Sequence, residues 1–440
     1  MHKLQAALLG MVLSMSSTAP AIAADAAQDP VAMATRLLDH MEAGEYEAAT
    51  ADFSPEMKAA LGVDKLAAVQ AQMAATGAEQ SRDAAQLSQQ SGMTVVAIRI
   101  HRAHADLDAT IAIDGHGKVA GLRYTPTAPP AAAPPADANY GERDFNVGGS
   151  DRALPGTLAM PKGDAPAKGV AAIVLVHGSG PQDRDETIGP NRPFLDIARG
   201  LAAQGIAVLR YEKRTKARPQ DYADGNVTID NETTDDAVAA VAALRATKGI
   251  DPARVFVLGH SQGGMMAPRI AARSGHVAGL VLLAAPARPL LDILIEQNIR
   301  LAVLDDGKTS DAEAAAIATL KQQVAAVRAS GDVAAKDTPM QQPASYWRTI
   351  DTVDSVAEAK AVALPMLVLQ GAQDIQVVDA DWQRWKGGFN DNPQVSFKLY
   401  PALNHLGMAV EGEQGLQQYS IPGHVDPQLI ADVAAWIDAH

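Results

Sequence analysis

The sequence predicts an α/β protein with a mostly parallel sheet, preceded by a small α+β domain. Three observations lead to this fold class. Apolar strand-like runs alternate with helical stretches from residue 140 onward, which is typical of a parallel sheet covered by helices. A Pro/Ala-rich segment at 126–139 separates this part from an earlier one, in which helices come first and strands second. An apolar run at 255–258 ends in Gly-His-Ser-Gln-Gly, and a helical stretch follows.

Length and net charge indicate how many domains to expect and which partners to exclude. The chain has 440 residues, too many for one modest core, so two domains are expected. Its 37 basic and 51 acidic residues give a net charge of −14. Because Lys and Arg must neutralise phosphates when nucleic acid binds, this balance argues against a nucleic-acid partner. No basic run indicates an anionic membrane surface, and the sequence indicates no protein partner.

The N-terminus predicts export. A weakly basic start, an apolar stretch at 4–15 and the A-x-A pattern at 21–23 make residues 1–23 resemble a cleavable signal peptide. Cleavage after Ala24 or Ala26 also fits the pattern. The apolar stretch is too short to span a bilayer, so we expect a periplasmic or secreted protein with no membrane insertion after cleavage. The chain has no cysteine, which excludes a lipid anchor on cysteine and any disulfide.

The first domain is expected at 27–125. Helical patterns cover 33–41 and 63–75, a polar Gln/Ser-rich patch follows, and strand-like runs cover 93–100, 107–113 and 119–124. The last two runs flank a Gly-containing turn and predict a hairpin. This layout, together with the region 44–53, resembles the DUF3887 domain found ahead of secreted hydrolases, which implies an NTF2-like cone shape.

Two histidines of this domain suggest a metal pair. His101 and His104 are three residues apart, but the sequence offers no third ligand near them. We therefore expect two surface histidines and no metal site.

The second domain is expected at 140–440, after the linker at 126–139. Strands are predicted at 143–147, 154–160, 171–176, 206–211, 255–258, 277–284, 365–369 and 395–400. Helices are predicted from Pro193 to a C-cap at Gly205, from Thr234 to Gly249, after the serine at 261, and at 427–439. Residues 290–363 interrupt this alternation and predict a helical cap.

The turn after residue 258 carries the candidate nucleophile. Ser261 lies between Gly259 and Gly263, and a Cβ at either glycine would clash in a turn that joins a strand tightly to a helix. This turn raises the serine hydroxyl above the sheet. The backbone N–H of Gln262 lies at the positive end of the new helix, where it can bind a developing oxyanion.

Two further residues complete a catalytic triad. A serine hydroxyl needs a base, and the base needs a carboxylate to orient it. Asp374 follows the strand at 365–369, and His405 follows the strand at 395–400. Because parallel strands end at one edge of a sheet, we expect both side chains beside Ser261. The order Ser, Asp, His is that of α/β-hydrolases, and residues 140–440 resemble a secreted serine esterase or S9-like hydrolase of that fold.

The resemblance extends to the loop His177-Gly178-Ser179-Gly180-Pro181. Its H-G-x-G pattern implies that Ser179 supplies a second oxyanion N–H, with Gly178 as the alternative. The charged segments 183–185 and 210–214 resemble loops that frame the site in such hydrolases, although we expect a structural role for these charges.

Each triad position has an alternative. Asp379 or Asp292 could supply the carboxylate in place of Asp374, and His260 lies beside the nucleophile. We expect His260 to serve packing, because it precedes the turn and points away from the hydroxyl.

Together these residues predict a serine hydrolase that cleaves carboxylic esters through an acyl-enzyme. Its substrate would be a small-molecule acyl ester, and no cofactor or metal is implied. The same machinery would serve an S9/S33-like peptidase or an acyl-thioesterase, and a non-catalytic binding module is a further alternative.

Overall fold

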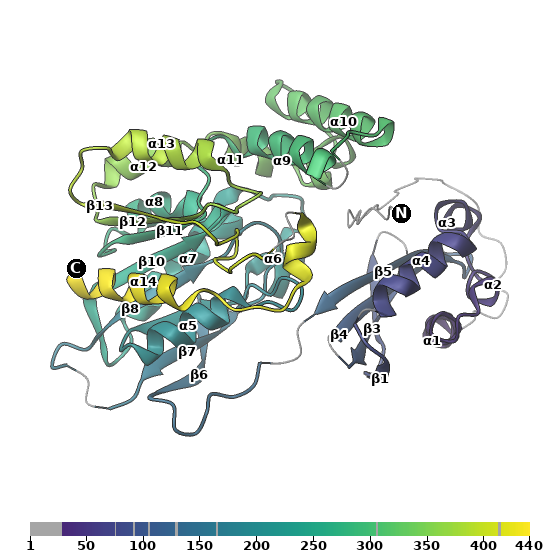
Figure 1. The fold of residues 1–440 in the computed structure, drawn as a ribbon, viewed down its shortest axis with the longest axis horizontal. Helices are drawn as coiled ribbons and strands as arrows, with labels where there is room; N and C mark the ends of the chain where they lie inside the picture. The colour runs from purple at the N-terminus through teal and green to yellow at the C-terminus, as the bar shows by residue number, and fades with distance from the viewer. Residues whose placement is uncertain are drawn as a thin grey trace. The chain divides into compact units, whose positions relative to one another are not determined.

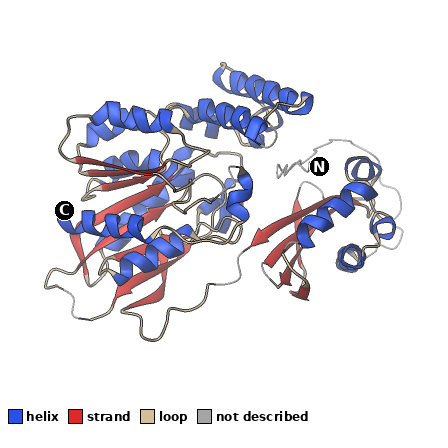
Figure 2. Ribbon diagram, in the orientation of Figure 1, coloured by secondary structure: helices blue, strands red, loops and turns tan. Residues whose placement is uncertain are grey.

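The computed structural model describes residues 29–74, 76–90, 93–103, 106–127, 131–163, 166–304, 307–411 and 415–440. The chain divides into two compact units, Met1–Ala131 and Ala132–His440 (Figures 1 and 2). The signal peptide predicted at 1–23 lies outside the described residues. No helix in the described ranges is long and apolar enough to cross a membrane.

The first unit is an α+β domain, as predicted. Its helices are α1 (Pro30–Ala43), α2 (Tyr46–Ala49), α3 (Pro55–Ala60) and α4 (Val63–Ala74). Its antiparallel strands are β1 (Glu79–Arg82), β2 (Gln86–Gln90), β3 (Met93–Arg102), β4 (Asp106–Ile113) and β5 (Val119–Thr127). The sequence fixes α1 locally: Asp29 accepts the N–H of Val31, and Gly44 ends the helix at φ 74°. The buried face of α1 shares one apolar core with alternate residues of β3 and β4.

Two features of this unit differ from the expectation. Strands β1 and β2 lie in the polar segment where no strand was expected. Both pair only with β3, and a strand at the edge of a sheet needs few apolar residues, so the sequence pattern is weak. Strand β5 continues to Thr127, two residues into the expected linker.

The second unit is built on one eight-stranded sheet. Its strands are β6 (Tyr140–Val147), β7 (Leu154–Pro161), β8 (Val170–Val176), β9 (Ala207–Tyr211), β10 (Ile250–His260), β11 (Leu280–Leu283), β12 (Met366–Gly371) and β13 (Val395–Tyr400). They lie in the order β13-β12-β11-β10-β8-β9-β7-β6. Strands β8 to β13 are parallel, whereas β6 and β7 are antiparallel to their neighbours. This confirms the predicted α/β fold.

Helices cover both faces of this sheet. They are α5 (Pro193–Ala203), α6 (Arg214–Ala217), α7 (Asp235–Arg245), α8 (Gln262–Ser274), α13 (Asp379–Phe389) and α14 (Pro427–Ala439). One core lies between the sheet and α7, α8 and α13, and the other lies between the sheet and α5 and α14 (Figure 1). Alternate residues of β8 enter opposite cores, which explains why the strand is apolar throughout.

The predicted cap region is helical. It contains α9 (Leu290–Leu304), α10 (Asp311–Arg328), α11 (Ala344–Asp351) and α12 (Ser355–Val362), drawn in green in Figure 1. Short 3₁₀ turns lie at Pro219–Tyr222, Ala335–Asp337, Pro339–Gln341 and Leu416–Ser420. A π-helical turn, η2 (Asp230–Thr234), precedes α7, so this helical stretch begins earlier and ends earlier than expected.

Candidate active site

Ser261 lies on a sharp turn between β10 and α8. Its backbone has φ 50° and ψ −121°, which is unfavourable for a residue with a side chain. The flanking glycines are required by space. A Cβ at Gly259 would lie 2.2 Å from the carbonyl oxygen of Gly263, and a Cβ at Gly263 would lie 2.1 Å from that of Val176. The turn therefore has the tight geometry that the sequence predicted.

The sheet register places three predicted residues at one edge. His260, Leu283, Leu369 and Lys398 lie in one row across β10, β11, β12 and β13. Ser261 follows this row directly, and Asp374 and His405 lie in the loops that leave β12 and β13. All three thus lie at the carboxyl edge of neighbouring parallel strands.

Asp374 and His405 form a buried pair. The Nδ1 atom of His405 lies 2.8 Å from Oδ2 of Asp374. The other carboxylate oxygen accepts the backbone N–H groups of Gln376 and Val377, at 2.7 and 3.0 Å. Because the carboxylate accepts, Nδ1 of His405 carries the proton, and Nε2 is left as the basic nitrogen of the neutral ring.

The two alternative carboxylates lie elsewhere. Asp292 is on α9 and pairs with Arg328 at 2.7 Å. Asp379 begins α13 and accepts the side-chain amide of Gln383. The structure therefore brings Asp374, and neither alternative, to His405.

The two oxyanion candidates also lie at the turn. Gln262 begins α8, so its N–H has no acceptor within the helix. The loop of Gly178 lies against the nucleophile, because a Cβ on Gly178 would lie 3.2 Å from Cβ of Ser261. The N–H of Gly178 already donates to Oε1 of Glu186 at 2.6 Å. This leaves Ser179, which is exposed, as the candidate donor of the loop.

The family described as serine aminopeptidase, S33 (Hydrolase_4), matches residues 168–411. The chain belongs to this family. A second family, the protein of unknown function DUF3887, matches residues 34–122 and bears out the resemblance of the first unit.

This hydrolase has a close relative in Thermotoga maritima. The protein named Esterase EstD is 36% identical over 335 residues, which cover 76% of each chain. Among solved structures, the Pyrococcus furiosus esterase Pf2001 has a TM-score of 0.44 at 14% identity, covering 71% of this chain and 97% of its own. Est1E from Butyrivibrio proteoclasticus has a TM-score of 0.43 at 16% identity, covering 68% and 99%.

His260 of the hydrolase has an ion-pair partner that was not expected. Its Nε2 lies 2.9 Å from the backbone carbonyl of His405, and its Nδ1 lies 2.9 Å from a carboxylate oxygen of Glu186. Burial is the largest single influence on the pKa of His260 and lowers it, but the charge and hydrogen bond of Glu186, the carbonyl of His405 and the charge of Asp374 together raise this pKa above its usual value. Burial opposes ionisation of Glu186 too, yet His260 holds the pKa of Glu186 below its usual value. His260 therefore packs against the rings of Phe194 and His405, as expected, and is in addition one half of a buried ion pair.

A second buried ion pair, Lys213–Glu232, lies beside the turn and was not predicted from the sequence. Nζ of Lys213 donates to the carbonyl of Gly178 and lies 2.7 Å from Glu232. The other oxygen of Glu232 accepts the side-chain amide of Gln262 at 3.1 Å. The amide oxygen of Gln262 accepts the hydroxyl of Tyr346, on cap helix α11, at 2.8 Å. Lys213 belongs to the charged segment 210–214, for which only a structural role was expected. Nothing in the sequence indicates that Glu232 and Tyr346 are linked to the turn.

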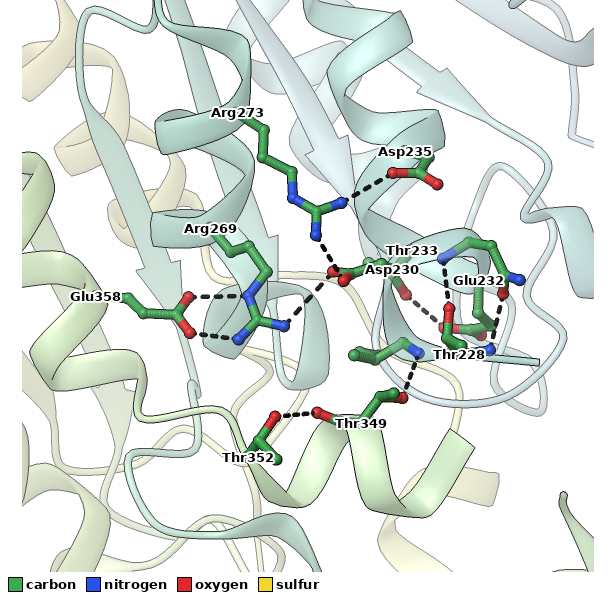
Figure 3. Close-up of polar contacts among 12 residues, drawn as sticks. Thr228, Asp230, Glu232, Thr233, Asp235, Arg269, Arg273, Thr349, Thr352 and Glu358 are labelled. Carbon is green, nitrogen blue, oxygen red and sulfur yellow. Dashed lines mark hydrogen bonds and ion pairs between the residues drawn. The ribbon is translucent and has the colours of Figure 1, made fainter. Parts of the chain in front are cut away.

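The turn that carries Glu232 is anchored by further polar contacts, shown in Figure 3. Asp230 accepts hydrogen bonds from Arg273 at 2.6 Å and from Arg269 at 3.5 Å, both on α8. Arg269 also binds Glu358 on α12. The hydroxyl of Thr349, on α11, accepts the backbone N–H of Ile229. Glu232 is thus held by a segment that is fixed to α8 and to the cap.

The other charges of the two segments are structural, as expected. Arg184 pairs with Glu212, Arg210 pairs with Asp185 and Glu142, and Arg214 pairs with Asp236 and Asp221.

The predicted surface role fits His101 in the first unit. It lies between Asp83 at 3.1 Å and Asp106 at 3.0 Å, whereas His104 falls outside the described residues. Across the described ranges, no group of three or more His, Asp or Glu side chains is arranged to hold a metal ion.

Proposed function

We propose that this chain is a serine esterase that cleaves small carboxylic esters through an acyl-enzyme. The observation that carries the proposal is the buried Asp374–His405 pair, at the same sheet edge as the strained Ser261. The named activity of the Thermotoga relative supports an ester substrate.

The residues would act in two steps. Oγ of Ser261 attacks the acyl carbon while Nε2 of His405 takes the serine proton. His405 then returns the proton to the leaving alkoxide, the C–O bond breaks, and the acyl group remains on Ser261. In the second step a water molecule attacks the acyl carbon while His405 takes its proton; the bond to Oγ of Ser261 then breaks, His405 returns the proton to that oxygen, and the acid leaves. The N–H groups of Gln262 and Ser179 would bind the oxyanion in both steps.

The family description favours one second candidate, an aminopeptidase. Such an enzyme needs a carboxylate to bind the substrate's terminal ammonium group. Two buried carboxylates beside the turn, Glu186 and Glu232, already have His260 and Lys213 as counter-ions. Neither is free to bind an ammonium group, so we place the esterase first.

A substrate panel with a Ser261→Ala control tests the proposal. We expect p-nitrophenyl esters of varied acyl length to be cleaved, with a higher kcat/KM than an aminoacyl p-nitroanilide. Ser261→Ala should lose about six orders of magnitude in kcat, and a fluorophosphonate probe should label only the unmodified enzyme. A higher kcat/KM on the anilide than on any ester would contradict the esterase proposal and indicate a peptidase.

We also propose that residues 1–23 direct export, on the basis of their apolar stretch and A-x-A pattern. N-terminal sequencing of protein recovered from the periplasm or medium should begin after Ala23, Ala24 or Ala26. A chain that retains Met1 and stays in the cytoplasm would contradict this.

A further inference from the structure

The peptide bond between Gly178 and Ser179 decides where the second oxyanion donor points. The described part of the chain has no cis peptide bond, so the carbonyl of Gly178 and the N–H of Ser179 point in opposite directions in one plane. Any group that holds the carbonyl therefore also aims the N–H.

Lys213 holds that carbonyl. Its Nζ lies 2.7 Å from the oxygen of Gly178, and its side chain is only 3% exposed. The carboxylate of Glu232, 2.7 Å away, is its counter-ion. A hydrogen bond from a buried cation is short and strong, and it withdraws electron density from the peptide. The N–H of Ser179 is consequently both aimed and made a better donor.

The N–H of Gly178 is held by a second buried side chain, that of Glu186. Glu186, 1% exposed, accepts the N–H of Gly178 and has His260 as its counter-ion. Glu186 adopts φ 51°, a conformation that a residue with a side chain rarely adopts. Two buried side chains of opposite charge therefore form hydrogen bonds with the backbone of Gly178, which lies against Ser261.

We propose that Lys213 and Glu186 are positioning residues that hold the oxyanion loop in its catalytic geometry. The proposal rests on the function proposed above and deepens it. The two residues act through the backbone of Gly178 and need not contact the substrate. Their effect belongs to the transition state, because an oxyanion donor binds the charged intermediate more strongly than the neutral carbonyl.

The central test is Lys213→Met. Removing an oxyanion donor typically costs 10²–10³-fold in kcat, and here the donor remains but is misaligned. We expect kcat to fall by about 10- to 100-fold with KM within about threefold of the unmodified enzyme. Affinity for a trifluoromethyl ketone analogue of the substrate, which forms an oxyanion on Ser261, should fall by a similar factor.

Arg184→Met is the matched control. Arg184 is a cation that likewise donates to a backbone carbonyl, that of Gly156, and is paired with a carboxylate, Glu212, although it is less buried than Lys213. Its hydrogen bonds go to Glu212, Gly156 and Thr157. Its loss should leave kcat and ketone affinity within about twofold.

Two further variants separate positioning from damage to the fold. Lys213→Met leaves Glu232 as a buried unpaired charge, so the double variant Lys213→Met/Glu232→Gln removes both charges together. It should show the same loss of kcat. Glu186→Gln keeps an acceptor for the N–H of Gly178 and should retain more activity than Glu186→Met, which does not.

The outcomes distinguish this proposal from the one on which it rests. Hydrolysis that survives in Ser261→Ala would overturn the proposed function. A folded Lys213→Met/Glu232→Gln variant with unchanged kcat and unchanged ketone affinity would overturn the positioning role alone. A rise in KM equal to the loss of kcat/KM, with kcat intact, would also overturn it, because it would indicate loss of ground-state binding.

Discussion

At the scale of single residues, the carboxylate of Asp374 is fixed from several directions. Its two oxygens receive the imidazole of His405, two backbone N–H groups and the side-chain amide of Gln370. Such a carboxylate can hold the imidazole in one tautomer and stabilise it when it becomes charged.

The first prediction concerns this carboxylate. Asp374→Asn should lower kcat by about 10⁴-fold, because an amide favours the wrong tautomer of His405 and cannot balance its charge. Asp379→Asn and Asp292→Asn are matched controls and should cost less than tenfold. Steady-state kinetics on a p-nitrophenyl ester measures all three. A loss of about 10⁴-fold in Asp292→Asn would instead indicate that the catalytic carboxylate is Asp292, on α9.

The second prediction concerns His177, which is buried between the rings of Phe194 and Tyr211. Burial lowers the pKa of His177 to about 4. Between pH 6.5 and about pH 4, the unfolded chain binds a proton at His177 that the folded chain does not bind. The free energy of unfolding should therefore fall as pH falls through this window, by about 3 kcal/mol in total.

Urea unfolding at pH 7 and pH 4.5 checks this prediction. A His177→Gln variant should lose less stability between the two pH values than the unmodified chain does. His276→Gln removes an exposed histidine and should leave the difference unchanged. Equal losses in all three chains would show that His177 is protonated in the fold.

The positions of the proposed catalytic residues at one edge of the sheet could be predicted from the sequence, but the buried ion pairs around them could not. Ser261, Asp374 and His405 each follow a recognisable strand, and parallel strands end together. The two partners of Gly178, Glu186 and Lys213, and the counter-ion Glu232 come from three separate segments. A charged residue in a loop is usually solvated, and only the fold shows which charges it buries.

At the scale of elements, the strands with apolar runs were predicted well and the polar ones were not. Strands β1 and β2 are largely exposed, so their sequences lack the alternation of apolar and polar residues that marks a half-buried strand. Helix α13 was not predicted, because its buried Trp382, Trp385 and Phe389 are interspersed with charged residues and glycines. The π-helical turn η2 has no sequence signature, and it is this turn that brings Glu232 to the site.

The third prediction concerns the link between cap helix α11 and the catalytic turn. Tyr346→Phe removes the donor to the buried side-chain oxygen of Gln262. A buried acceptor without a donor typically costs about 1–3 kcal/mol, so the free energy of unfolding should fall by that amount. Chemical denaturation measures it.

Tyr400→Phe is the control for this element. The hydroxyl of Tyr400 donates to Asp432, which keeps its contacts with Lys398 and Gln428. Its loss should cost under about 1 kcal/mol. A cost at Tyr346 no larger than this would mean that the cap is not tied to the turn through Gln262.

At the scale of the whole molecule, all the catalytic candidates lie in one of the two compact units. The first unit has its own apolar core, so we expect each part to fold alone. The division into 27–125, 126–139 and 140–440 stays a prediction in its details, since β5 ends at Thr127 and the second unit begins at Ala132.

The fourth prediction follows from this division. A chain of residues 132–440 should fold, as judged by circular dichroism, and keep most of its kcat on an acetyl ester. Residues 27–127 alone should fold and show no hydrolysis. Loss of acetyl-ester activity in a folded 132–440 chain would mean that the first unit completes the active site.

The order of the strands along the chain also governs when the enzyme can first work. Ser261 follows β10 in the middle of the sheet, whereas Asp374 and His405 follow β12 and β13, which extend the sheet outward to one edge. A chain leaving the ribosome thus exposes its nucleophile long before it acquires the base that activates it. By the proposed mechanism, a chain in which β13 has not yet docked lacks its base, and we expect it to be inactive.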